Sequence, residues 1–224
     1  MEWLAAVAHE IRNPLAAIRC AVRILKAPEQ ADATREEAQA VIDRQISRIA
    51  RISDDLLDAG YVSAGKLELR KEPIDMRDIV GAAVETCRAQ LDANGNDLIL
   101  GLPPQPVALT ADPLRLIQVV TNLLDNAVKY SEVNGTIIVH LEDLQNEVIV
   151  RVMDDGMGIA AEFLPHVFDL FAQAEEANSH GREGMGIGLN LVKRIVELHR
   201  GAVDAFSAGP GMGSTFTVRL PRNA

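Results

Sequence analysis

Apolar side chains recur along the start of the chain at alternating steps of three and four positions. They stand at Leu4, Val7, Ile11, Leu15, Ile18, Val22 and Leu25. This spacing predicts one amphipathic helix over 4–25, with a heptad seam along one face. His9 falls on the opposite face, so we expect an exposed imidazole. Its pKa should lie near the ordinary value of about 6.5, which leaves a neutral ring nitrogen free to act as a nucleophile.

Pro14 lies inside the same predicted helix. An interior proline costs roughly 3 kcal/mol, and its ring crowds the carbonyl four residues back, here that of Glu10. The apolar pattern resumes beyond the proline, so we expect the helix to bend and continue. Local faults of this kind cluster at functional sites. From this stretch alone, a surface histidine beside an incidental kink explains the pattern equally well.

A second helical pattern runs from Thr34 to about Gly60, where Thr34 and Glu37 have the spacing of a capping box. Its apolar positions again form a seam: Ala38, Val41, Ile42, Ile46, Ile49, Ile52, Leu56 and Ala59. Residues 1–60 are therefore predicted to form an antiparallel helical hairpin. One hairpin buries too little apolar surface to be stable, so we expect two copies to pair as a dimeric four-helix bundle.

Beyond a small-residue linker at 61–65 the pattern changes to mixed helices and strands. Lys66 to Arg70 alternates as a strand does. We expect helices over 76–93, 113–130 and 186–199, and strands over 98–100, 107–109, 136–141, 147–153, 202–207 and 214–220. The fold class is therefore α+β: a helical hairpin followed, over 66–224, by an α/β sandwich with a mixed, largely antiparallel sheet.

Composition narrows the function classes. The net charge of −10 and the aromatic content of 4% argue against binding to nucleic acid or to an anionic membrane. Cys20 and Cys87 have neither metal-ligand spacing nor a disulfide framework, which fits a cytoplasmic location. The first seam begins almost at Met1 without a capping residue. We therefore expect a longer parent with an upstream sensor domain, and a natural short form is the alternative.

Two stretches have the chemistry of a phosphate and metal site. The run Gly184-Met185-Gly186-Ile187-Gly188 leads into a predicted helix, whose free N–H groups and dipole attract phosphate. It matches neither a Walker A loop nor a Rossmann fingerprint, and a flexible hinge explains it as well. Asn122 and Asn126 share one face of the 113–130 helix with Lys129. A carboxamide oxygen can ligate Mg²⁺ when substrate phosphates supply the remaining ligands, although a solvated helix face is the plainer explanation.

Asp154 ends a predicted strand and is followed by Gly156 and Gly158. Its carboxylate can accept a hydrogen bond from the exocyclic amine of adenine, and the glycines leave space for a flat base. An ordinary Asp-Gly turn explains the same residues.

Taken together and in order, these motifs resemble the catalytic core of the sensor histidine kinases of two-component signalling. His9-Glu10-x-x-Asn13-Pro14 resembles the H box of that family, and Asn122-x-x-x-Asn126-Ala127-x-Lys129-Tyr130 resembles its N box. The remaining matches are Asp154-x-Gly156-x-Gly158, Phe168-x-x-Phe171, Gly184-x-Gly186-x-Gly188-Leu189 and Gly211-x-Gly213-Ser214-Thr215. One departure is Glu183, which stands where many members of the family have a second glycine just before Gly184. It leaves open how flexible the segment over the nucleotide, the lid, would be.

The resemblance implies an ATP-binding fold shared with the gyrase, Hsp90 and MutL ATPases, with residues 1–60 as dimerisation and phosphotransfer domain. It implies that His9 attacks the γ-phosphate, that Glu10 takes the ring proton, and that Asn13 orients water for dephosphorylating a response regulator. Asn126 would ligate Mg²⁺, and Asp154 would bind adenine. The other implied nucleotide-binding residues are Asn122, Lys129, Tyr130, Gly156, Gly158, Gly184, Gly186, Gly188, Leu189 and Thr215.

Three other functions compete with a histidine kinase that phosphorylates itself and then a response regulator. A pseudokinase that signals by shape would not need Glu10, Asn13 and Asn126. Another ATPase of the same fold leaves the His9 helix unexplained. A zinc peptidase would need a histidine where Asn13 stands.

Overall fold

The structure is a computed structural model, and it describes residues 2–27, 31–63, 67–173 and 186–222. Within the helical hairpin some side chains, including those of His9 and Glu10, lie outside the described part. Among the described residues, no helix combines the length and the apolarity that crossing a lipid bilayer requires.

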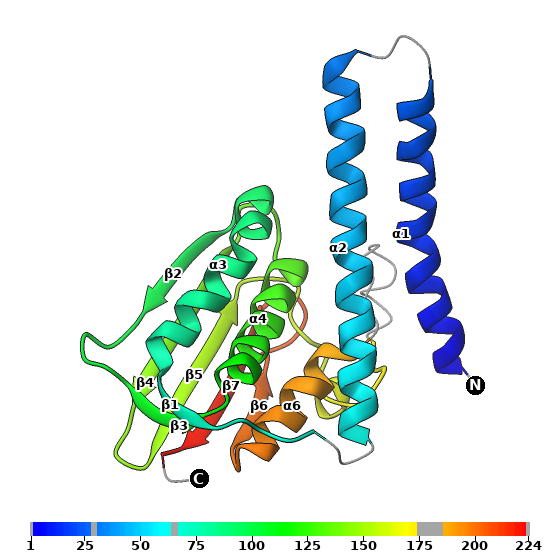
Figure 1. The fold of residues 1–224 in the computed structure, drawn as a ribbon. Coiled ribbons are helices and arrows are strands. Elements are labelled where there is room, and N and C mark those ends of the chain that lie inside the picture. Colours follow the sequence, from blue (N-terminus) through cyan, green and yellow to red (C-terminus); the bar gives the residue numbers. More distant parts are fainter. Residues whose placement is uncertain (1, 28–30, 64–66, 174–185, 223–224) are drawn as a thin grey trace.

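Two long helices, α1 (Glu2–Lys26) and α2 (Asp32–Ser63), form the predicted hairpin, which stands beside the rest of the chain (Figure 1). The α1 helix continues through Pro14, as the resumed apolar pattern predicts. The start of α2 differs from the prediction. It begins at Asp32, so Thr34 lies inside the first turn and does not cap it. It also continues past Gly60, because one glycine weakens a helix by only about 1 kcal/mol.

The second part of the chain is built on a five-stranded sheet in the order β2-β4-β5-β7-β6. The strands are β2 (Asp97–Gly101), β4 (Thr136–Asp143), β5 (Glu147–Asp154), β6 (Ala202–Phe206) and β7 (Ser214–Pro221). The pair β2 and β4 is parallel, and the other neighbours are antiparallel. The mixed, largely antiparallel sheet is thus confirmed.

Three helices cover one face of this sheet: α3 (Met76–Asn94), α4 (Pro113–Tyr130) and α6 (Gly188–Leu198) (Figure 1). Asp75 caps α3 as predicted, because its carboxylate accepts a hydrogen bond from the backbone N–H of Arg77 at 3.1 Å. The core lies between helices and sheet. Its fully buried members include Leu91, Leu116, Leu123, Leu124, Ile137, Leu141, Leu191, Ile195 and Leu220.

A second, two-stranded sheet pairs β1 (Glu72–Asp75) with β3 (Ala108–Ala111). The strand predicted at 66–70 is wrong, because residues 67–71 have no strand partner. Leu67 packs against the core of the domain, and Leu69 is half-buried. Alternation reports that one side of the segment is buried, and it does not report whether a neighbouring strand exists.

Candidate nucleotide site

The polar face of α4 lies against the beginning of α6. Asn122 and Asn126 are half-buried and one helical turn apart. A Cβ atom placed on Gly188 would stand 3.6 Å from the carboxamide of Asn122, so the two helices are close there. The Nδ2 atom of Asn122 is buried and has no hydrogen-bond partner among the described residues. An orphaned buried donor fits a site that a polar ligand completes.

The first backbone N–H groups of α6 have no hydrogen-bond partner within the helix itself. Its N-cap residue, Ile187, makes no side-chain capping bond. Two loop contacts brace this end: the N–H of Phe171 donates to the carbonyl of Gly186 at 2.9 Å, and Nδ2 of Asn190 donates to the carbonyl of Phe168 at 2.9 Å. An uncapped helix start of this kind attracts phosphate.

For two predicted residues of this glycine run, Leu189 and Gly184, nucleotide contact stays a prediction. Leu189 is half-buried, and its side chain packs against the domain core. Gly184 lies outside the described residues.

Asp154 ends β5 with both carboxylate oxygens engaged. Oδ1 accepts a hydrogen bond from the N–H of Gly156 at 2.9 Å, and Oδ2 accepts one from Oγ of Ser214 at 2.6 Å. Burial raises the pKa of the Asp154 carboxyl, although these hydrogen bonds act in the opposite direction. A half-buried acceptor held in one orientation is suited to recognising a base edge.

The hydroxyl that reaches Asp154 belongs to Ser214 and not to its neighbour Thr215, whose role toward nucleotide stays a prediction. In the register of β5 and β7, Asp154 stands opposite Ser214, whereas Thr215 stands opposite Met153. Successive side chains of a strand point to opposite faces, so Thr215 lies on the face away from Phe216 and the core. The sequence motif contains both hydroxyls, and only the register distinguishes them.

The loop after Asp154 joins the end of α4. The N–H of Met157 donates to the carbonyl of Tyr130 at 3.0 Å. A Cβ on Gly156 would lie 2.2 Å from that same carbonyl oxygen, so only glycine allows this approach. Nζ of Lys129 is held by the hydroxyl of Tyr130 at 3.0 Å. The structure therefore brings the asparagine helix, the Asp154 loop and the glycine-rich start of α6 to one place.

A small apolar cluster joins this place to the helical hairpin. Ile187 and Ile52 are 2% and 7% exposed, and Val7, Ile11, Leu56 and Phe171 pack around them. Phe171 adopts a positive φ of 66°, which is rare for an aromatic residue. Figure 1 shows α6 against the lower part of α2. The start of α6 thus meets the hairpin through α2, in a cluster that also includes Val7 and Ile11, the residues two positions before and after His9.

The histidine motif is only partly described. The side chains of His9 and Glu10 lie outside the described part, so their predicted exposure and contact stay predictions. Asn13 is half-buried, and Pro14 is buried.

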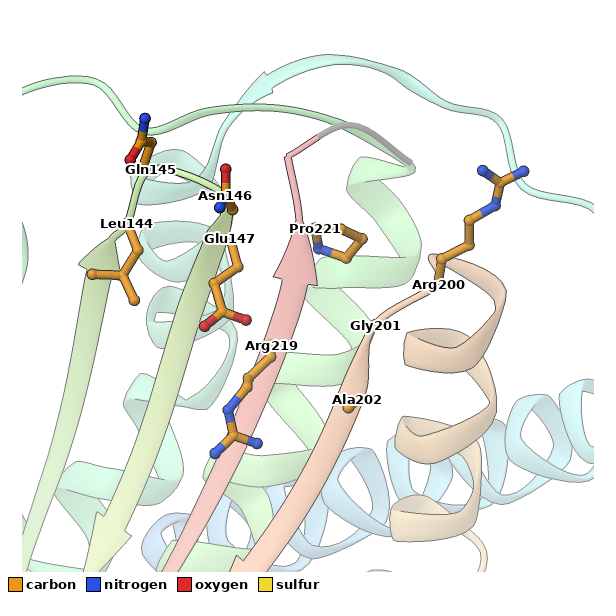
Figure 2. Close-up of a pocket in the computed structure, with 9 residues that line it drawn as sticks. All are labelled: Leu144, Gln145, Asn146, Glu147, Arg200, Gly201, Ala202, Arg219 and Pro221. Carbon is orange, nitrogen blue, oxygen red and sulfur yellow. The ribbon is translucent and has the colours of Figure 1, made fainter.

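A separate pocket of about 500 Å³ lies at the other end of the sheet. It is lined by residues of the β4–β5 turn, the α6–β6 turn and the end of β7, among them Leu144, Glu147 and Arg219 (Figure 2). Glu147 begins the strand that Asp154 ends, so the pocket and the Asp154 site are a strand's length apart. The pocket contains none of the predicted site residues.

Two family models match the chain. The model described as "Histidine kinase-, DNA gyrase B-, and HSP90-like ATPase" matches residues 111–224. The model described as "His Kinase A (phospho-acceptor) domain" matches residues 1–65.

Curated relatives align along almost the whole chain. Two-component system protein A of Emericella nidulans is 34% identical over 96% of this chain and 32% of its own length. Sensor histidine kinase RcsC of Escherichia coli is 31% identical over 98% of this chain and 23% of its own length. The chain therefore spans a third or less of these two relatives.

Solved structures share the fold. Histidine kinase AdeS of Acinetobacter baumannii has a TM-score of 0.70 at 23% identity, covering 96% of this chain and 98% of that one. Full-length ShkA in complex with AMPPNP has a TM-score of 0.70 at 25% identity, covering 100% of this chain and 46% of that one.

Proposed function

The chain belongs to the histidine kinases of two-component systems, and on this premise we propose that it is an ATP-dependent protein-histidine kinase core that phosphorylates His9. The phosphoryl group then passes to an aspartate of a response regulator. Residues 1–60 would form the phosphotransfer domain, 61–65 the linker and 66–224 the ATP-binding domain.

The observation that carries this proposal is the apolar cluster between the two parts of the chain. Ile187 immediately precedes the uncapped start of α6, and it belongs to one apolar cluster with Ile52 of α2, against which Val7 and Ile11 of α1 also pack. His9 lies midway between those two residues in sequence. A γ-phosphate held at the start of α6 would therefore lie on the side of the domain that meets the hairpin on which His9 lies.

The proposed reaction needs little covalent chemistry from the protein. A neutral ring nitrogen of His9 attacks the γ-phosphorus, the bond from that phosphorus to the bridging oxygen breaks, and ADP leaves with the electron pair. Glu10 accepts the proton from the other ring nitrogen. Asp154 would hold the adenine amine, and the N–H groups at the start of α6 would hold the phosphates.

Mg²⁺ would neutralise phosphate charge, and we propose Asn126 as its protein ligand, with Asn122 beside it. The residues present fit such a group, because the carboxamide oxygen of Asn122 lies beside Gly188 at the start of α6, and an amide oxygen suits a hard cation. Among the described residues no group of three His, Cys, Asp or Glu side chains could hold a metal ion. The phosphates would therefore supply most of the ligands.

Three further parts of the proposal concern partners and location. Exposed apolar residues on the hairpin, among them Leu15, Ile24 and Ile46, support a homodimer formed through residues 1–60.

Asn13 would orient water when the kinase dephosphorylates its regulator, and a dephosphorylation assay on Asn13→Ala tests that role. We place the domain in the cytoplasm, where ATP is available, below an upstream sensor domain of the parent.

Labelling with γ-³²P-ATP tests the central step. We expect a label that is stable in base and labile in acid, and that a chelator of Mg²⁺ abolishes. His9→Gln should lose the label and still bind ATP, because the nucleotide site lies in the other domain. His140→Gln, a half-exposed histidine on β4, is the matched control and should keep it. If the wild-type protein binds ATP and acquires no label, the result would instead favour a pseudokinase.

A further inference from the structure

The hydroxyl of Ser207, just after β6, lies between two loops that are far apart in sequence. Its Oγ accepts a hydrogen bond from the N–H of Ile159 at 3.0 Å and donates one to the carbonyl of Gly213 at 2.7 Å. It also contacts its own loop, because the N–H of Gly209 donates to Oγ at 3.2 Å. One side chain therefore links the loop at 156–159 to the loop at 207–213.

The same two loops are joined by backbone bonds. The N–H of Gly213 donates to the carbonyl of Gly156 at 3.0 Å, and the N–H of Gly211 donates to the carbonyl of Met157 at 2.6 Å. A Cβ placed on Gly158 would lie 2.1 Å from the carbonyl oxygen of Gly209. The two loops are in direct backbone contact, so a hydrogen bond between them affects the position of both.

Both loops lead directly to Asp154. The 156–159 loop follows it in the chain, and Gly156 donates to its Oδ1. The 207–213 loop ends at Ser214, which donates to its Oδ2. The hydroxyl of Ser207 therefore holds together the two segments that orient the carboxylate from either side.

We propose that Ser207 is a positioning residue for the base of the bound nucleotide, acting through the loops that orient Asp154. This rests on the proposed function, which makes Asp154 the group that recognises adenine. Without the hydroxyl, the N–H of Ile159 and the carbonyl of Gly213 lose their partner. The backbone hydrogen bonds between the loops remain, but the two loops are held less rigidly and so is the carboxylate that they orient.

The effect should fall on the base and not on the phosphates. Each described hydrogen bond of Ser207 is with the 156–159 or the 207–213 loop, and none reaches α6. We expect a less firmly held Asp154 to lose about the equivalent of one hydrogen bond to the base, which predicts binding weakened about five- to tenfold. The loss should be the same for ATP, ADP and AMP, and the phosphorylation rate at saturating ATP should be unchanged.

Calorimetric titration of the full chain with ATP, ADP and AMP tests this. Ser207→Ala should weaken all three equally, and Ser207→Thr, which keeps the hydroxyl, should bind within about twofold of wild type. Thr110→Ala, which removes an exposed hydroxyl on β3, is the control and should bind as wild type does. Unchanged affinity in Ser207→Ala, or a loss that grows with the number of phosphates, would overturn the proposal.

Hydrogen exchange of the Ile159 amide tests its hydrogen bond to Ser207 without any nucleotide. We expect protection in wild type and in Ser207→Thr, and faster exchange in Ser207→Ala. Equal exchange in all three proteins would show that the bond is not made. If Ser207→Ala does not fold, Ser207→Thr decides, and tenfold weaker binding or lost protection there contradicts the proposal. A wild-type protein that binds no adenine nucleotide, yet protects this amide from exchange, would refute the kinase proposal. The link that Ser207 makes between the two loops would still hold.

Discussion

Asp154 shows how one half-buried carboxylate can lower the stability of the fold at neutral pH. Its carboxyl is half-buried, and burial raises its pKa above the ordinary value. For an acid, a raised folded-state pKa means that the protonated form stabilises the fold. That contribution is present at low pH and is lost as the pH rises through the folded-state pKa. At neutral pH the ionised group therefore lowers stability, and it is available as a hydrogen-bond acceptor.

Asp154→Asn should separate stability from binding. The amide carries no charge to desolvate, so the nucleotide-free protein should be as stable as wild type or more stable at pH 7. An amide group can no longer offer a charged acceptor to an adenine amine, so affinity should fall about 10- to 100-fold. Thermal unfolding with and without ADP measures both effects.

The control for this variant is Asp92→Asn, which changes an exposed carboxylate on α3. It should leave both quantities unchanged. A variant at Asp154 that is clearly less stable and still gains stability from ADP would mean that the carboxylate has a structural role.

At the scale of elements, a buried histidine helps to join three segments. They are α4, α6 and the segment around Arg70, which follows the hairpin. His199, after α6, accepts a hydrogen bond at Nε2 from the N–H of Asp112 at 3.1 Å. Its Nδ1 bonds the carbonyl of Ile195 at 2.8 Å, which assigns the proton to Nδ1. The carboxylate of Asp112 caps α4 and accepts from the N–H of Arg70 at 2.8 Å. The neutral imidazole thus joins three segments.

His199 should make the fold sensitive to mild acid. Burial lowers its pKa, the charge of Lys71 acts in the same direction, and the charge of Asp112 opposes both. A lowered folded-state pKa contributes stability above the unfolded value of about 6.5, and this is lost as the pH falls through the folded-state pKa. His199→Gln should cost about 1–3 kcal/mol at pH 7.5, and less at pH 5.5.

Urea unfolding at a series of pH values measures this difference. His140→Gln, at a half-exposed position, is the control and should retain the acid sensitivity of wild type. A cost at His199 that does not change with pH would mean that the imidazole stays neutral throughout.

Secondary structure was predictable wherever the local signal was strong. The caps Asp75 and Asp112 and the periodic apolar faces located α3 and α4 to within a residue or two. The segment at 66–70 was predicted wrongly because a strand needs a neighbour, which alternation cannot supply. The start of α2 was predicted wrongly because several polar residues near it can occupy a helix start.

At the scale of the whole molecule, the hairpin is the part that is left incomplete in a single chain. Ile46 on α2 is 53% exposed, and Leu57 is 56% exposed. Such residues, repeated along both helices, form an apolar surface that a second copy can cover. The predicted four-helix bundle would bury them.

Ile46→Asp should convert a dimer into a monomer, because the bundle would have to bury an unpaired charge. Sedimentation equilibrium of the two proteins measures the change. The chain provides a close control: Ile99 on β2 is 52% exposed, and Ile99→Asp introduces the same charge away from the hairpin. That variant should remain dimeric. Dissociation of both variants, or of neither, would count against a dimer formed through the hairpin.

The sequence by itself determined the order of the elements, the two-part division and the set of polar residues from which a nucleotide site could be built. These depend on local periodicity, capping and spacing, which short stretches of chain express without their neighbours. Only the tertiary structure decided that Ser214 and not Thr215 reaches Asp154, that Ser207 joins two distant loops, and that Ile187 shares an apolar cluster with Ile52 of α2. Strand register and packing between distant segments decide these contacts, because they set which side chains share a face and no local pattern records them.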